Sequence, residues 1–112
     1  MMIEAERFAH NIREAGGSVK DAEEKACRME AEEKKQFALL QVQALSEGYK
    51  TVASQTTYAD ATEAMYQARI NRGVAKAGIA AAKANLLAAE VEFKIWQTQM
   101  ATIRQEKRVY GS

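Results

Sequence analysis

A heptad repeat of apolar side chains near the end of the chain constrains the fold more than any other feature. With residue 79 placed at heptad position a, nine of the ten a and d positions from 79 to 110 are apolar or aromatic. The ten residues of this a/d seam are Ile79, Ala82, Leu86, Ala89, Phe93, Trp96, Met100, Ile103, Lys107 and Tyr110. A repeat that continues for more than four heptads predicts a long helix that packs against another helix.

A second row of small and apolar residues occupies heptad positions c and f, on the opposite side of the same helix. Its members are Val74, Ala77, Ala81, Ala84, Ala88, Val91, Ile95, Thr98 and Thr102. A helix that is apolar on two opposed faces is expected to lie between neighbours. One neighbour can be a helix over 18–47. The other can be residues 3–14, a folded-back 58–72 or a second copy of the chain.

Composition agrees with a helical chain of low net charge. The 112 residues include no proline, and Ala, Glu, Lys, Leu and Arg make up half of them, as is typical of long helices and coiled coils. Fifteen acidic against sixteen basic residues exclude a strongly basic nucleic-acid condenser and a strongly acidic DNA mimic. Leu, Ile, Val and Phe number only 20. Burial between subunits would therefore compensate for a small core.

Glycines and capping residues divide the chain. Gly16 and Gly17 are predicted to end a first short helix. Ser18 is predicted to begin the next, which ends before Gly48. The predicted segments are a helix over 3–14, a helix over 18–47, a connection over 48–57 and a helix over 58–108.

The predicted fold is all-α, with residues 1–112 forming a single helical domain. The segments assemble either as a long antiparallel helical hairpin or as a three-helix bundle, with coiled-coil-like packing in both. One alternative concerns the connection. Val42, Leu45, Tyr49 and Val52 keep heptad spacing, so continuous helix through 48–57 is the other possibility.

No pattern of residues indicates catalysis. His10 is the only histidine and Cys27 the only cysteine, so neither has a second such residue for a catalytic pair or a metal site. The acidic residues of 23–33 are interleaved with bases, which indicates a solvent-exposed face. Phosphate-binding loops and zinc-ligand spacings are also absent from the sequence. We therefore predict no enzymatic activity, no cofactor, no metal and no small-molecule substrate.

A cytoplasmic location is expected. No segment reaches the roughly 20 apolar residues of a membrane span, and the first residues lack the basic and apolar stretches of a signal peptide. The unpaired Cys27 suits a reducing compartment.

The large side chains of the a/d seam predict a protein interface. The candidate interface residues are Leu86, Phe93, Trp96, Met100, Ile103 and Tyr110. The predicted function is therefore a non-catalytic interaction protein that binds itself, a larger protein, or both. Adaptor, assembly-factor and inhibitor roles all fit, and the small size is typical of phage or mobile-element proteins.

Clustered bases allow an alternative function, a nucleic-acid-binding accessory protein. The candidate contacts to phosphates or to an acidic partner are Arg69, Arg72, Lys76, Lys83, Arg104, Lys107 and Arg108. Residues 71–112 carry seven bases and three acids, whereas residues 1–36 carry seven bases and nine acids. This asymmetry could serve phosphate contacts, or it could align subunits acidic end to basic end.

Overall fold

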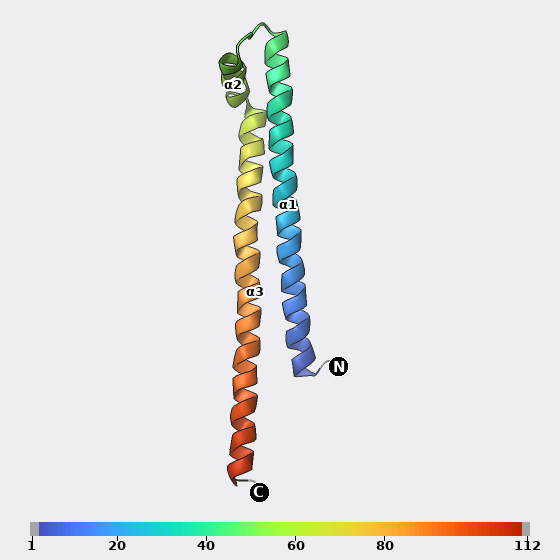
Figure 1. Cartoon of the computed structure of the whole chain (residues 1–112), viewed down its shortest axis with the longest axis vertical. Helices are drawn as coiled ribbons and strands as arrows, with labels where there is room; N and C mark the ends of the chain where they lie inside the picture. Colours follow the sequence, from blue (N-terminus) through green and yellow to red (C-terminus); the bar gives the residue numbers. More distant parts are fainter. Residues whose placement is uncertain (1–2, 111–112) are drawn as a thin grey trace. The chain divides into compact units, whose positions relative to one another are not determined.

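The computed structural model describes residues 3–110, except for the side chain of Tyr110. This part of the chain forms three helices and no strand: α1 (Glu4–Ser46), α2 (Val52–Asp60) and α3 (Glu63–Tyr110) (Figure 1). The all-α prediction is confirmed.

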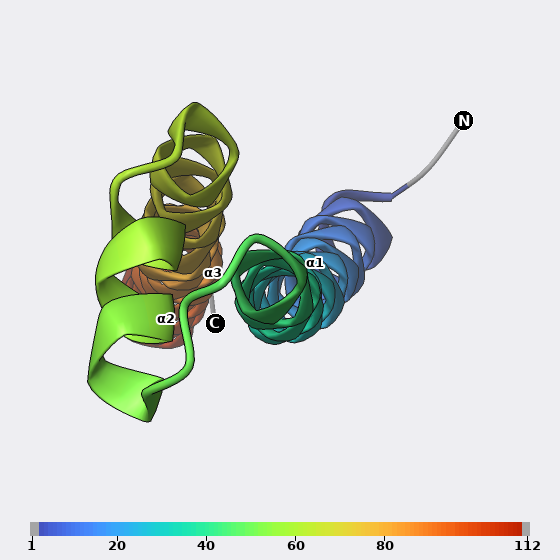
Figure 2. The same cartoon turned by 90° about the horizontal axis from the view of Figure 1, so that it is seen from above.

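The chain divides into two compact units. We call residues 20–80 the hairpin unit, and the described residues of 1–19 and 81–112 the terminal unit. In the hairpin unit α1 leads into a bend, α2 lies at that bend on the side of α3, and α3 returns antiparallel to α1 (Figures 1 and 2). The predicted helical hairpin is therefore present in this unit.

The predicted break at Gly16 and Gly17 is wrong, because α1 is continuous through both glycines. Ser18 does not cap a new helix; its hydroxyl donates instead to the carbonyl of Glu14, 3.2 Å away, within the same helix. Two internal glycines cost a helix about 1 kcal/mol each. Packing of both ends of α1 against α3 overcomes that cost. The predicted helices 3–14 and 18–47 are one helix.

The end of α1 agrees with the prediction and has a defined cap. Gly48 has a φ of 101°, a conformation that favours glycine. The amide of Tyr49 donates to the carbonyl of Ala44 at 3.0 Å, and the amide of Gly48 donates to the carbonyl of Leu45 at 3.2 Å. These two bonds define a Schellman motif, which satisfies the last carbonyls of the helix.

The connection is shorter than predicted, and the alternative of continuous helix through it is wrong. Thr51 caps α2, because its hydroxyl accepts the amide of Ser54 at 3.1 Å. Hydroxyl residues that weaken a helix interior thus start a helix here. The last helix begins later than the predicted residue 58. Thr62 accepts the amide of Met65 at 3.2 Å, and α3 follows from Glu63.

A small apolar core holds the hairpin unit together. Leu40 is 7% exposed, Met65 is 1% exposed and Ala59 is fully buried. Phe37 packs against this cluster. Met65 lies two heptads before Ile79 and in the same register. The a/d seam therefore begins earlier on α3 than the sequence analysis placed it.

In the terminal unit the a/d seam faces the first turns of α1. Ala82 is buried, and the larger side chains of the seam up to position 100 are half-buried. The c/f row is uncovered here, with Val91 44% and Ile95 54% exposed. The segment 3–14 was one of the expected neighbours for that row. From residue 4 on it belongs to α1, and it packs on the a/d seam instead.

Candidate protein interface

Phe93 and Trp96, two of the predicted interface residues, form an aromatic cluster with Phe8 of α1. The ring centroid of Phe8 lies 5.5 Å from that of Trp96 and 6.0 Å from that of Phe93. The indole Nε1 of Trp96 donates to the Glu4 carboxylate at 2.7 Å. Arg7 places its guanidinium 5.3 Å from the centre of the Phe8 ring. This part of the predicted interface is therefore occupied within the chain.

The remaining predicted interface residues differ in their surroundings. Leu86 and Met100 are half-buried, whereas Ile103 is 41% exposed. Residues 101–109 are all exposed. The side chain of Tyr110 lies outside the described part of the chain.

An exposed apolar face on the opposite side of α3 is the second candidate interface. Leu87, Val91 and Ile95 are 61%, 44% and 54% exposed. Ala84 and Ala88 are exposed beside them. We call these five residues the outer face. The c/f row of the sequence pattern contained four of them, but nothing in the sequence showed which row would stay uncovered.

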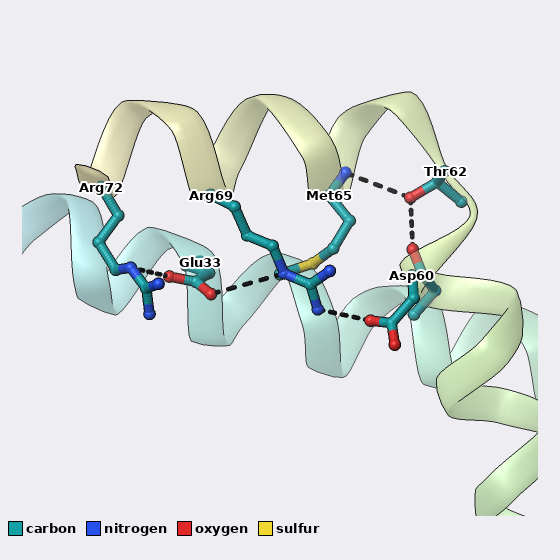
Figure 3. Close-up of polar contacts among 7 residues, drawn as sticks. Glu33, Asp60, Thr62, Met65, Arg69 and Arg72 are labelled. Atoms are coloured by element: carbon teal, nitrogen blue, oxygen red, sulfur yellow. Dashed lines mark hydrogen bonds and ion pairs between the residues drawn. The ribbon is translucent and has the colours of Figure 1, made fainter. Parts of the chain in front are cut away.

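Two of the predicted basic contacts, Arg69 and Arg72, form ion pairs inside the hairpin unit (Figure 3). Arg72 Nε lies 2.9 Å from Glu33 Oε2, and Arg69 Nε lies 3.9 Å from Glu33 Oε1. Arg69 also bonds through Nη2 to the carboxylate of Asp60. The Glu33 side chain is only 14% exposed. Its Oε2 accepts no well-directed hydrogen bond, so the contact with Arg72 is electrostatic.

These pairs cancel charge locally, since two arginines meet two carboxylates. Among the other predicted basic contacts, Lys76 and Lys83 remain exposed without this neutralisation. Arg104 and Lys107 are exposed near the end of α3. Arg108 is also exposed and takes part in an interaction within the chain. The structure does not bring the seven bases together into one patch.

An open groove of about 400 Å³ lies beside the ion pairs, in the hairpin unit. Its lining includes Cys27, Glu23, Glu30 and Lys76. The thiol is exposed. His10, elsewhere on α1, lies 3.3 Å from the carboxylate of Glu14. Within residues 3–110 no three His, Cys, Asp or Glu side chains are placed to hold a metal ion.

Tyr58 of α2 has a perturbed phenol. A hydrogen bond with the Glu47 carboxylate, together with some desolvation and the carboxylate charge, raises the pKa of Tyr58. Its ring centroid lies 5.2 Å from that of Tyr49. Both tyrosines line an open depression of about 600 Å³, which is formed by the connection after α1, by α2 and by the turn before α3.

Within the described residues, no helix combines the length and apolar character needed to cross a membrane. The fold and these surfaces place the chain in the class of all-α helical hairpins. Comparison with protein-family models, with curated proteins and with solved structures finds no match. Any functional conclusion therefore depends on the residues of this chain.

Proposed function

We propose that the protein is a non-catalytic α-helical interaction protein that associates through the outer face of α3. The exposure of Leu87, Val91 and Ile95 on one side of a single helix carries this proposal. Contiguous exposed apolar side chains are characteristic of protein interaction sites. Each residue is more than two-fifths exposed, so a partner that covered this face would remove substantial apolar area from water.

A second copy of the chain is a fitting partner, because the outer face is complementary to itself. In an antiparallel pair centred between residues 89 and 90, Ile95 of one copy lies opposite Ala84 of the other. Val91 then lies opposite Ala88. These two large side chains each meet an alanine, so the two helices could approach closely there, whereas Leu87 would lie opposite Glu92 of the other copy.

Association with a larger protein would use the same face in an adaptor, an assembly factor or an inhibitor. We place this activity in the cytoplasm, and the small size of the chain is typical of proteins that phages encode. The exposed thiol of Cys27 supports a reducing compartment.

Absolute molar mass in solution tests the proposal. We expect the wild-type chain to elute with about twice its 12.4 kDa mass at micromolar concentration, measured by light scattering behind a sizing column. The double variant Val91→Gln/Ile95→Gln should return to 12.4 kDa with unchanged helical circular dichroism, because both side chains are exposed. Asn85→Gln, exposed on the same helix and outside the outer face, is the matched control. A wild-type mass of 12.4 kDa would reject self-association.

The alternative, nucleic-acid binding, loses support from the pairing of Arg69 and Arg72 with carboxylates. Phosphate binding would depend on the exposed Lys76 and Lys83 and on the bases near the end of α3. Its signature is an affinity for single- or double-stranded DNA that falls steeply with salt, with a log–log slope near the number of phosphate contacts. Lys76→Gln/Lys83→Gln should reduce that slope by about two if this alternative holds.

A further inference from the structure

We propose that the part of α3 after Trp96 is a docking site for an acidic amphipathic helix of another protein. That helix would pack on the a/d seam just beyond Phe93 and Trp96, where α1 packs on the same seam. Met100 and Ile103 would be its apolar contacts, and Arg104 and Lys107 its charged contacts. This inference rests on the proposed function, in that it gives the interaction protein a partner of stated chemistry.

Continuity with an existing interface is the first argument. Phe93 and Trp96 occupy successive positions of the a/d seam, and Phe8 of α1 packs on both. Met100 and Ile103 are the next two positions. Figure 1 shows the last turns of α3 continuing beyond the first turn of α1, in the terminal unit. The seam therefore continues where the described part of α1 does not cover it.

Exposure and shape support the same site. Ile103 is 41% exposed, although it holds a seam position, and residues 101–109 are all exposed. A shallow depression of about 350 Å³ lies here, lined by Thr98, Gln99, Met100, Thr102, Ile103 and Glu106. An apolar side chain from a partner helix could pack into it between Met100 and Ile103.

The basic residues at this site favour a partner helix that carries acidic residues. Lys107 takes the seam position after Ile103, and Arg104 lies beside the seam. A wholly apolar partner would desolvate the Lys107 ammonium without supplying a counter-charge, which is costly. Carboxylates on the partner would pair with both bases. A second copy of this segment would bring the same bases together. Glu106 is the only acid among residues 97–112, so repulsion disfavours that pairing.

The test uses two synthetic helical peptides of about four heptads, with leucine at positions a and d. The acidic peptide carries glutamate at e and g, and the basic peptide carries lysine there. Each is labelled and titrated with the full chain while fluorescence anisotropy is recorded. We expect the acidic peptide to bind with a Kd of order 10 µM, and the basic peptide at least about tenfold more weakly.

Variants locate the binding. Ile103→Ala and Arg104→Gln/Lys107→Gln should each weaken binding of the acidic peptide by about tenfold. All three positions are exposed, so the variants should fold, and circular dichroism checks this. Lys83→Gln, which removes an exposed base elsewhere on α3, is the matched control and should change the Kd less than twofold. Val91→Gln/Ile95→Gln should also leave binding unchanged, which separates this site from the outer face.

Five results would overturn the inference. The acidic peptide could fail to bind at about 100 µM chain, or bind no better than the basic one. Lys83→Gln could weaken binding of the acidic peptide as much as Arg104→Gln/Lys107→Gln does. A single-stranded oligonucleotide could bind more tightly than the peptide and lose that binding in Arg104→Gln/Lys107→Gln, making nucleic acid the occupant. A wild-type dimer that Ile103→Ala dissociates would make a second copy the occupant.

Discussion

The indole of Trp96 is held by two residues one helical turn apart on α1. Phe8 packs on its ring, and Glu4 accepts its N–H at 2.7 Å. Because the side chain is half-buried, we expect Trp96→Ala to lower the free energy of unfolding by about 2–4 kcal/mol, somewhat less than the roughly 3–5 kcal/mol lost at a fully buried aromatic residue. Urea unfolding followed by circular dichroism measures this loss.

An exposed aromatic on the same helix gives the control for that substitution. Tyr66 is 58% exposed, so Tyr66→Ala should cost less than about 0.5 kcal/mol. If the two substitutions cost the same, the cluster of Trp96 with Phe8 does not contribute to stability, and the half-buried position of the indole is wrong.

The Tyr58 phenol gives a prediction about pH. Its pKa is raised, chiefly because the protonated hydroxyl is bonded to Glu47. In the unfolded chain tyrosine titrates near pH 10. The contribution of this contact to stability is therefore fully present below about pH 10 and is lost as pH rises through the folded pKa. Ultraviolet titration of wild type against Tyr58→Phe isolates the phenol. Glu47→Gln should move its pKa down toward the ordinary value, and no movement would contradict the assignment.

Two glycines inside α1 and one in the cap that follows it are of opposite kinds, and substitution by alanine separates them. An added Cβ at Gly16 or Gly17 would meet nothing within 4 Å, so each change should stabilise the chain by about 0.5–1 kcal/mol. Gly48 also has open space, but its φ of 101° strains any residue with a Cβ. Gly48→Ala should cost about 1–2 kcal/mol. Thermal melts of the three variants test this, and a loss at Gly16 or Gly17 would mean that α1 is not regular helix there.

Local spacing explains which elements the sequence could predict. The a/d seam indicated the packed side of α3 only as far as Met100, because the heptad pattern lies within one helix. The end of α1 at Gly48 was predicted because its cap depends on adjacent residues. The break at Gly16 and Gly17 was wrong because helix propensity there is outweighed by the contact between Phe8 and α3. Such a contact joins residues far apart in the chain, and no local pattern encodes it.

The candidate site was predictable only in part, for the same reason. The sequence identified Phe93 and Trp96 as seam residues but could not show that α1 would cover them and leave Val91 and Ile95 exposed. The pairing of Arg72 with Glu33 was also missed. The sequence did contain a signal for this pairing, because Arg72 and Glu33 each stand where their helix otherwise has apolar residues. A charge at such a position requires a counter-charge on the helix opposite.

Across the whole molecule, stability depends on few buried side chains. Among the described residues only six apolar side chains are buried, four of them alanines. Net stability is therefore expected at the low end for a domain of this size. The ion pair of Glu33 with Arg72 therefore affects the stability of the entire chain. Glu33 is only 14% exposed, and without Arg72 its charge would have only Arg69, at 3.9 Å, as a counter-charge.

A double-mutant cycle measures that contribution. Arg72→Leu should destabilise the chain by about 1–2 kcal/mol, less than for a fully buried pair, because the arginine is 47% exposed and Arg69 remains beside Glu33. Glu33→Leu should cost a similar amount, since it leaves Arg72 without its carboxylate, beside Arg69 on the same helix. The double variant Glu33→Leu/Arg72→Leu should recover part of the loss, with a coupling energy of about 1 kcal/mol in urea unfolding. Purely additive losses would show that the pair is only a solvated contact, and Arg72 would then be available to an anionic partner.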